Sequence, residues 1–365
     1  MRIVLDLRIF GPQYGGLGRY NQQLLLNLAK FDLKNQYIIL VKKLSSDLPK
    51  LPDNFSWKIC PYHWYSLKEQ IFLPFILKKL KPDLVHFPHF NVPIFYRGKF
   101  IVTIHDLIMT KFPSIRTSTL NRFVFIFKRL AYQLTIKLAI KKAAKIIAVS
   151  KFTAEDIKNY FKLNQKQAEK IKVIYEGLTP IQNTSEINDD LPEKFFLYVG
   201  NAYPHKNLEF LLTVFKEFLK NQPDFYLVLV GTHNYFYQEL KKYAGQHVIF
   251  AGFIADKKLA AYYKQAQAYI FPSLYEGFGL PPLEALAHQT LVLSSSETCL
   301  PEILADAVLY FDPKNKEDLL NKMQIILKDE DLKQQLNANS AKILARYSWE
   351  KMAQEIIQLY CIIML

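Results

Sequence analysis

Short apolar segments alternate with longer segments of helical periodicity along this 365-residue chain, and the whole alternation runs twice. This pattern is typical of β-α-β units, in which helices cover a buried parallel sheet. In the first half we expect strands at residues 2–7, 37–41, 84–87, 100–104, 146–149 and 172–174. The second half repeats the pattern at residues 195–199, 225–230, 248–250, 268–271, 291–294 and 307–311. The sequence therefore predicts an α/β protein of two doubly wound domains that face each other across a cleft.

The polar segment Thr179–Glu193 separates the two halves. It contains two prolines and shows no periodicity, so we interpret it as a linker and as the hinge of the cleft. We expect one Rossmann-like domain at residues 1–182 and a second at residues 183–347. Residues 348–365 form a further amphipathic segment. The longest predicted helices lie at residues 18–30, 66–80, 117–144, 208–220, 235–243, 257–265, 282–288, 316–327 and 330–347.

Positive charge is concentrated in the first half. The formal charge of the chain is +14, and residues 1–182 hold 30 Lys and Arg against 11 Asp and Glu. The 48 residues between Asp106 and Glu155 contain ten basic side chains and no acidic one. A basic surface interleaved with aromatic residues suits an anionic bilayer or a nucleic acid, although these cations fall nearly all round a helical wheel. We favour an anionic membrane surface and no nucleic acid, with a merely basic cytosolic surface as the remaining alternative.

Cysteine content and hydropathy narrow the class of protein further. Cys60, Cys299 and Cys361 are isolated, so neither a disulfide framework nor a cysteine zinc site is expected. The sequence has no run of about 18 uncharged apolar residues, and its start resembles a strand rather than a signal peptide. We therefore expect a cytoplasmic or peripheral protein that does not span a membrane.

Two glycine-containing turns follow predicted strands. The segment FGPQYGGLGRY at residues 10–20 precedes a helix, where backbone N–H groups can hold a phosphate. Its spacing is not GxGxxG, which disfavours a nicotinamide dinucleotide site. In YVGNAYPHKN at residues 198–207, Lys206 is placed to meet a diphosphate. The residues alone leave open that the first turn is structural, that Asn207 is only a helix N-cap and that His205 faces solvent.

Three histidines follow strands of the first half. His105 comes directly after residues 100–104, and a neighbouring carboxylate moves the titration of an imidazole toward or past neutrality. Spacing alone favours a structural role for His105. His86 and His89 lie three residues apart, but no cysteine or second acidic ligand accompanies them, so we expect no metal site.

The most specific motif is FPSLYEGFGLPPLEALAH at residues 271–288. Glu276 lies in the loop after a strand, and Glu284 lies eight residues later in a helix that begins near two prolines. Gly277 and Gly279 let the backbone between them turn its amides toward a bound group. One carboxylate suits sugar hydroxyls and the other a ribose diol. A proline-initiated helix with Glu284 complementing its dipole explains the same residues equally well.

Taken together, these motifs resemble family 4 retaining glycosyltransferases of the GT-B fold. The resemblance covers nearly the whole chain in the family's order and includes GFGLPP between Glu276 and Glu284, PHKN at 204–207, GGLGRY at 15–20, TIHDL at 103–107 and AVSKFTAEDI from Ala148. The sequence is similar in particular to bacterial mannosyl- and rhamnosyltransferases that build lipopolysaccharide O-antigen or exopolysaccharide. Residues 348–365 look like the family's closing helix, which crosses back to the first domain.

The resemblance implies a role for each matching residue. It implies that Glu284 binds the nucleotide ribose, that Lys206 binds the diphosphate and that Gly16 approaches the diphosphate from the first domain. It further implies that His105 contacts the donor sugar near the reacting carbon. The donor sugar and the departing phosphate would be held by Glu276 and the amides of Gly277, Phe278 and Gly279.

Two positions depart from the family's pattern. Many members carry an arginine shortly after the glycine that corresponds to Gly200, whereas Asn201 and Ala202 stand here. We expect His205 or Arg19 to compensate. The usual asparagine before a glycine is replaced by Glu176, so no role is carried over to that position.

The expected reaction is transfer of a hexose from a nucleotide-sugar donor to a lipid-linked or polysaccharide acceptor in cell-surface glycan synthesis, at the inner face of the cytoplasmic membrane and without a metal or other cofactor. GDP-mannose is the first choice of donor, and UDP- or dTDP-sugars are alternatives. A nucleotide-sugar epimerase or a glycogen-type glucan synthase of the same architecture, and a non-enzymatic nucleic-acid-binding protein, remain competing interpretations.

Overall fold

The computed structural model describes residues 1–112, 122–179, 190–232 and 234–364. The chain divides into two compact units, each described here by itself. Unit 1 consists of Met1–Gly177 together with Ser348–Leu365, and unit 2 consists of Leu178–Tyr347. Most of the segment that the sequence marks as a linker, residues 180–189, lies outside the described residues.

Unit 1 contains a seven-stranded sheet over the described residues, and each pair of neighbouring strands is parallel. The central strands are almost continuously apolar and fully buried, as expected of a parallel sheet with helices on both faces. The strand order is β3 (Phe55–Ile59), β2 (Gln36–Val41), β1 (Arg2–Asp6), β4 (Leu84–Phe87), β5 (Phe100–Ile104), β6 (Lys145–Ala148) and β7 (Ile171–Val173).

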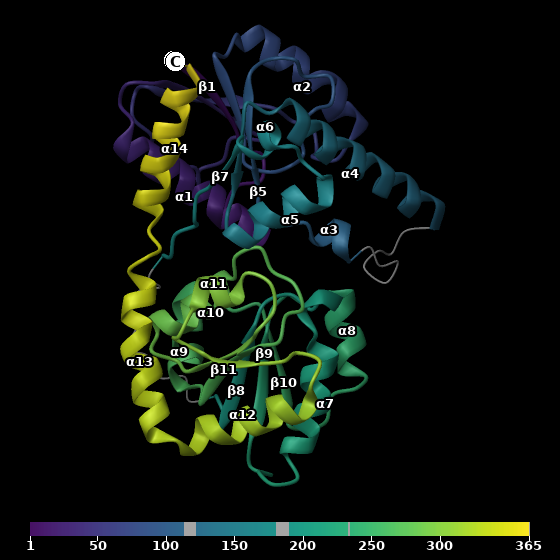
Figure 1. Cartoon of the computed structure of the whole chain (residues 1–365), viewed down its shortest axis with the longest axis vertical. Helices are drawn as coiled ribbons and strands as arrows, with labels where there is room; N and C mark the ends of the chain where they lie inside the picture. The colour runs from purple at the N-terminus through teal and green to yellow at the C-terminus, as the bar shows by residue number, and fades with distance from the viewer. Residues whose placement is uncertain (113–121, 180–189, 233, 365) are drawn as a thin grey trace. The chain divides into compact units, whose positions relative to one another are not determined.

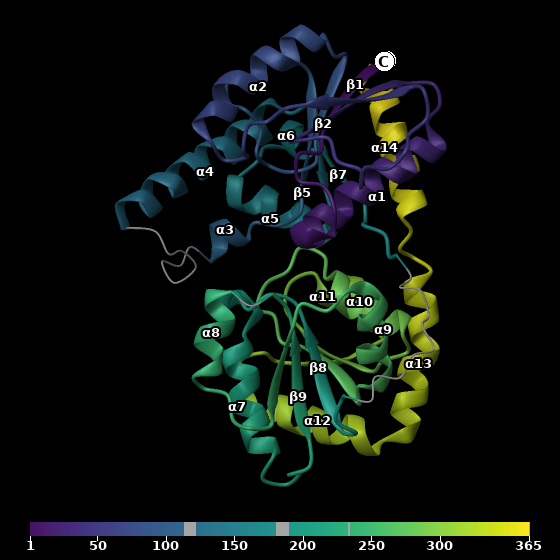
Figure 2. The same ribbon diagram turned by 180° about the vertical axis from the view of Figure 1, so that it is seen from behind.

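Helices cover both faces of this sheet. In Figures 1 and 2, α1 (Gly15–Phe31) and α14 (Trp349–Met364) lie on one face, and α2 (Leu67–Leu80), α4 (Arg122–Lys142) and α5 (Lys151–Phe161) lie on the other. The short helices α3 (Ile108–Lys111) and α6 (Gln165–Ala168) complete the unit. An ion pair of 2.5 Å between Lys30 and Glu350 joins α1 to α14, so the end of the chain is part of unit 1.

Unit 2 repeats the architecture with a six-stranded parallel sheet among its described residues. The strand order is β10 (Val248–Gly252), β9 (Tyr226–Val230), β8 (Phe195–Val199), β11 (Ala268–Phe271), β12 (Val292–Ser295) and β13 (Leu309–Phe311). One face carries α7 (Leu208–Phe218), α8 (Tyr235–Lys241) and α12 (Lys316–Lys328). The other carries α9 (Asp256–Gln265), α10 (Leu280–Ala287), α11 (Leu300–Leu304) and α13 (Glu330–Leu344).

The predicted fold class is confirmed, and the differences concern edges and short helices. Strand β3 was not predicted, because it lies at the sheet edge with only Phe55 buried and so lacks a continuous apolar run. Its alternation of Phe55, Trp57 and Ile59 is the signal that would have revealed it. The predicted helix at residues 117–144 appears as α4, and its expected start at Thr117 lies outside the described residues.

The strand orders place one special position in each sheet. In unit 1 the chain runs outward in opposite directions from the neighbouring strands β1 and β4. In unit 2 the same reversal occurs at β8 and β11. The crevice beyond the carboxyl ends of two such strands is where open α/β sheets bind ligands. The residues that follow these four strands are therefore placed where a ligand is expected to bind.

Candidate active site

Lys206 and Glu276 meet beyond the carboxyl ends of β8 and β11. The Lys206 ammonium donates a hydrogen bond of 2.6 Å to Glu276 Oε1, and the two side chains are only 12% and 10% exposed. The ammonium also lies 5.3 Å from the centre of the Phe271 ring, a distance at which a cation is attracted to the ring face. Two residues that are 70 positions apart in the sequence thus form one partly buried ion pair at the switch point of unit 2.

The loops on either side hold this pair in place. Lys206 ends a single 3-10 turn, Pro204–Lys206, whose first residue has its φ fixed by the proline ring. The carbonyl of His205 accepts a hydrogen bond of 2.7 Å from the Leu274 amide, which ties the two loops together. The Glu276 amide donates a hydrogen bond of 3.2 Å to Thr298 Oγ1. The charged groups are therefore positioned by backbone contacts and not by their own attraction alone.

His205 does not face solvent, contrary to one expectation from the sequence. Its side chain is buried, and burial, together with the neighbouring Lys206 charge, lowers its pKa to about 4. His205 is therefore neutral at physiological pH and adds no positive charge beside Lys206. Asn207 does not cap α7 with its side chain either. Its backbone adopts a left-handed conformation, and its side-chain Nδ2 donates a hydrogen bond of 2.9 Å to the Pro313 carbonyl oxygen.

Glu284 lies on α10, which follows the glycine loop. The helix begins after Gly279, whose backbone has φ +98°, a conformation that residues with a Cβ rarely adopt. The Glu284 carboxylate is mostly buried and accepts a hydrogen bond of 3.4 Å from the Tyr263 hydroxyl. Because Glu284 is not in the first turn of α10, complementing the helix dipole does not explain its position.

The neighbouring Phe278 belongs to the core of unit 2. Its ring packs edge-on against Tyr347 with ring centres 5.4 Å apart. Its carbonyl accepts a hydrogen bond of 3.2 Å from the Cys299 thiol. The Phe278 side chain therefore anchors the glycine loop to the core of unit 2.

In unit 1 the glycines of GGLGRY open helix α1 next to β1. A Cβ added at Gly16 would meet no atom within 4 Å, so this backbone faces open space. Gly18 is different, because a Cβ there would lie 1.9 Å from the Gly11 carbonyl oxygen. Gly18 is thus required for the tight turn, whereas Gly16 keeps the helix start accessible.

His105 forms an ion pair that the sequence did not reveal. Its Nδ1 lies 2.8 Å from Oε1 of Glu176, and its Nε2 lies 3.0 Å from the Pro88 carbonyl oxygen. Burial alone lowers the pKa of His105, but the hydrogen bond and charge of Glu176, aided by the Pro88 carbonyl, outweigh burial and raise it. The pair lies beyond the carboxyl end of β5.

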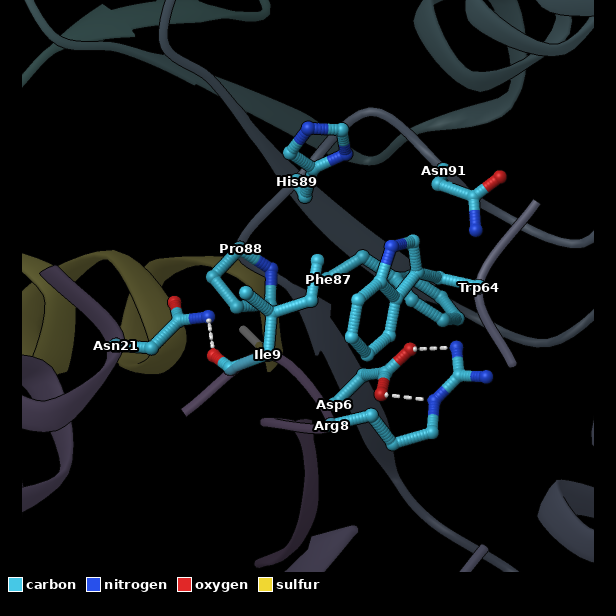
Figure 3. Close-up of a pocket in the computed structure, with 9 residues that line it drawn as sticks. All are labelled: Asp6, Arg8, Ile9, Asn21, Trp64, Phe87, Pro88, His89 and Asn91. Atoms are coloured by element: carbon cyan, nitrogen blue, oxygen red, sulfur yellow. Dashed lines mark hydrogen bonds and ion pairs between the residues drawn. The ribbon is translucent and has the colours of Figure 1, made fainter. Parts of the chain in front are cut away.

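A small pocket lined by both polar and apolar residues lies at the switch point of unit 1, beyond the ends of β1 and β4 (Figure 3). Its lining includes Asp6 and Arg8, whose buried side chains form two hydrogen bonds of 2.6 Å. Arg8 also pairs with the fully buried Glu69, which accepts two further hydrogen bonds from Asn91. The pocket is also lined by Ile9, Asn21, Trp64, Phe87, Pro88 and His89.

Sequence reasoning did not identify the polar residues around this pocket, nor Glu176. These residues are Asp6, Arg8, Glu69 and Asn91. The charged residues Asp6 and Arg8 at the end of the first apolar run were the available signal, because charges next to a buried strand need partners.

Both ring nitrogens of His86 have hydrogen-bonding partners. One ring nitrogen contacts the Tyr360 hydroxyl at 2.7 Å and the other contacts Thr103 Oγ1 at 2.9 Å. In the part of the chain that the structure describes, no group of three or more His, Cys, Asp or Glu side chains is placed to hold a metal ion. Nor does any helix in that part have the length and apolar character needed to cross a bilayer.

Two family models match the chain in succession. The model described as Glycosyltransferase Family 4 matches residues 14–180, and the model described as Glycosyl transferases group 1 matches residues 182–343. The chain is 23% identical to the O-antigen chain mannosyltransferase RfbU of Salmonella typhimurium, over 97% of this chain and 98% of that protein. It is 27% identical to the serotype-specific mannosyltransferase WbdA of Escherichia coli over 75% of this chain, although the match covers only 34% of WbdA.

A solved structure has the same architecture. Sucrose-phosphate synthase from Thermosynechococcus elongatus superposes with a TM-score of 0.76 and 22% sequence identity, covering 99% of this chain and 98% of that one. This likeness shows the fold, and the two family models show the family. The chain therefore belongs to glycosyltransferase family 4 and is a GT-B glycosyltransferase that uses a nucleotide-sugar donor.

Proposed function

We propose that this enzyme transfers a mannosyl group from GDP-mannose to a lipid-linked glycan during O-antigen synthesis, with retention of configuration. The observation that carries the donor site is the Lys206–Glu276 pair at the switch point of unit 2. The choice of mannose and of O-antigen follows from the names of the two relatives, RfbU and WbdA.

The proposed step breaks the bond between the anomeric carbon and the donor phosphate and forms a bond from that carbon to an acceptor hydroxyl oxygen. The acceptor proton passes to the departing phosphate. The carbon gains oxocarbenium character while negative charge grows on the diphosphate, so catalysis requires preorganised positive charge at the leaving group. Lys206 supplies that charge from a partly buried position, where electrostatic interactions are stronger than in water.

The remaining residues of unit 2 hold the donor. Glu284 binds the ribose diol, because a carboxylate accepts hydrogen bonds from two hydroxyl groups well. Glu276 and the backbone of Gly277, Phe278 and Gly279 hold the sugar and the phosphate. A ligand that draws Lys206 toward its phosphates also releases one oxygen of Glu276 for a sugar hydroxyl.

Unit 1 contributes Gly16 and His105. The exposed backbone of Gly16 in the first turn of α1 lets a diphosphate approach the N–H groups of the helix start. Within the described residues, no side chain caps the N-terminus of this 17-residue helix, and its first turn contains no acidic residue. To His105 we assign a contact with the donor sugar, as the family resemblance implies.

Calorimetric titration of the full chain with GDP-mannose, UDP-glucose and dTDP-rhamnose tests the donor. We expect GDP-mannose to bind at least tenfold more tightly than the other two. Tighter binding of a UDP- or dTDP-sugar would overturn the choice of GDP-mannose as donor but would leave the assignment as a glycosyltransferase unchanged. Isomerisation of the sugar with donor alone would instead favour an epimerase. Activity that is unchanged by EDTA is expected, because Lys206 and the helix termini take the place of a metal.

We also propose that unit 1 docks on an anionic membrane through α4. Residues 126–131 of this helix are all exposed, because its first half extends beyond the rest of unit 1 (Figures 1 and 2). This explains why the cations fall nearly all round the helical wheel. The exposed stretch combines apolar Phe127 and Leu130, 68% and 60% exposed, with Lys128 and Arg129. Apolar side chains flanked by cations suit the headgroup region of an anionic bilayer.

The membrane proposal is tested by sedimentation with vesicles of phosphatidylglycerol and phosphatidylethanolamine. Lys128→Glu/Arg129→Glu should reduce binding at least tenfold, and Phe127→Ser/Leu130→Ser should reduce it about as much. A charge-matched control is Lys216→Glu/Lys220→Glu on unit 2, which should bind as the parent does. Equal loss in this control, or binding to zwitterionic vesicles at high salt, contradicts a specific role of α4. Intact binding to RNA in place of vesicles would favour the nucleic-acid interpretation.

A further inference from the structure

The hydrogen bonds of His105 define its charge. Nδ1 lies 2.8 Å from a Glu176 carboxylate oxygen, and Nε2 lies 3.0 Å from the Pro88 carbonyl oxygen. A carbonyl oxygen only accepts hydrogen bonds, and so does an ionised carboxylate. Both ring nitrogens must therefore donate, which requires the doubly protonated, positively charged imidazolium.

The groups around this ring support the same state. Glu176 is 6% exposed, so a neighbouring cation is needed to offset the cost of burying its carboxylate. Asp106 adds a second negative charge near His105. His86 and His89 are neutral, since burial and the charge of His105 lower the pKa of each to about 3.

The remaining neighbour of the ring comes from α1. Tyr20 packs perpendicular to the imidazole, with ring centres 4.6 Å apart. Burial raises the pKa of Tyr20, so its hydroxyl stays neutral. Glu176 and Asp106 are thus the two carboxylates that favour the charged form of His105.

The backbone that carries Glu176 is fixed by the far end of the chain. The next residue is Gly177, and a Cβ there would lie 2.1 Å from the Trp349 backbone nitrogen at the start of α14. Trp349 also contacts the Tyr20 ring at 6.2 Å between ring centres. The backbone next to Glu176 is therefore packed closely against the start of α14.

We infer that Glu176 is a positioning residue that keeps His105 as a fixed imidazolium, so that His105 serves the transfer reaction as a cation and not as a general base. A proton acceptor needs a free nitrogen lone pair, and both nitrogens of this ring carry protons. This inference rests on the proposed role of His105 in donor binding. It assigns a function to the position where Glu176 stands in place of the family's usual asparagine.

The charge of His105 is measured directly by ¹⁵N NMR on the full chain labelled at its eight histidines. Signals of both ring nitrogens at pH 7.5 should show the imidazolium form for one histidine, and His105→Gln should remove that signal. A neutral His105 at pH 7.5 overturns the inference. This readout requires neither turnover nor a Glu176 variant that folds.

The effect on catalysis is tested with Glu176→Gln, which keeps a hydrogen-bond acceptor but removes the charge. Burial then dominates, and His105 loses its proton at lower pH. We expect kcat of Glu176→Gln at pH 8 to be at least tenfold below the parent and the ratio to narrow as the pH falls toward 6. The matched control, Glu155→Gln on the surface of α5, should leave the profile unchanged.

The two possible failures are distinguishable. Parallel pH profiles for the parent and Glu176→Gln would overturn the inference while leaving the transferase intact. Full activity in His105→Gln, with the imidazolium signal present in the parent, would instead remove the proposed catalytic role of His105 while leaving its charge state as inferred.

Discussion

The His105–Glu176 pair of unit 1 and the Lys206–Glu276 pair of unit 2 both lie at the carboxyl edge of a sheet, and the two pairs differ in spare hydrogen-bonding capacity. In unit 1 both donors of His105 are used, by Glu176 and by a backbone carbonyl. In unit 2 Lys206 makes one hydrogen bond among the described residues, to Glu276, although an ammonium has three donors. Both N–H donors of His105 are therefore occupied, and its partners fix its charge. Lys206 keeps donors that a ligand can use while its hydrogen bond to Glu276 is still in place.

The largest effect is expected from removing Lys206, the cation proposed to bind the diphosphate. Lys206→Ala should lower kcat about 100-fold, because a preorganised charge at the leaving group typically contributes 10² to 10³ in rate. Steady-state kinetics with saturating donor measure this effect. Lys220→Ala, an exposed lysine paired with Glu217 on the same unit, is the control and should stay within twofold. A Lys206 variant as active as this control would contradict the site.

The partner carboxylate comes next. Glu276→Ala should lower turnover at least tenfold, because it leaves Lys206 without its ion-pair partner and removes the proposed contact to the sugar. In the double variant Lys206→Ala/Glu276→Ala, the loss in kcat should be smaller than the product of the two single-variant losses, since residues in direct contact couple. A double-mutant cycle in kcat measures the coupling. Fully multiplicative losses would mean that the two residues act independently.

A smaller effect is expected at the ribose. Glu284→Ala should weaken binding of the nucleoside diphosphate about tenfold, the loss of one hydrogen-bonded charged group, and leave kcat within twofold. Calorimetric titration with the nucleotide measures it. Tyr263→Phe removes only the hydroxyl that donates to Glu284 and should weaken binding less. An effect on kcat larger than on binding would place Glu284 nearer the reacting carbon.

The smallest effect concerns the stability of unit 1 against pH. The raised pKa of His105 means that folding favours its protonated form, so the stabilisation is fully present below about pH 6.5, the ordinary value of an unfolded histidine. The stabilisation is lost as the pH rises through the pKa that His105 has in the folded protein. The loss is about 1.4 kcal/mol for each unit by which the folded pKa exceeds the unfolded pKa. Hydrogen exchange of unit 1 at pH 6 and pH 9 measures it. The difference should vanish in Glu176→Gln, and an unchanged difference there would assign it to another group.

Much of the fold and part of the site follow from local sequence. The buried strands are continuous apolar runs bounded by turns, so β4, β5, β8 and β11 were predicted at their observed positions. Lys206 and Glu276 each follow such a strand, and parallel strands bring their carboxyl ends to one edge. Their proximity is thus a consequence of topology that can be anticipated before any side chain is placed.

The rest depends on contacts that no local pattern encodes. Glu176 follows the short, partly exposed strand β7, and nothing near it in the sequence indicates His105, 71 residues earlier. The burial of His205 depends on the packed loops around it, whereas its neighbours PHKN suggest an exposed turn. Edge strand β3 lacks the continuous apolar run by which the central strands were recognised.

The contact between Gly177 and Trp349 has a consequence for synthesis of the protein. Unit 1 is completed by α14, yet the whole of unit 2 is translated between Gly177 and Ser348. On the ribosome, the sheet of unit 1 emerges early but lacks the helix that packs against α1 and buttresses Glu176. A chain that stops after unit 2 therefore keeps Lys206 and Glu276 but leaves the histidine of unit 1 without its supporting scaffold.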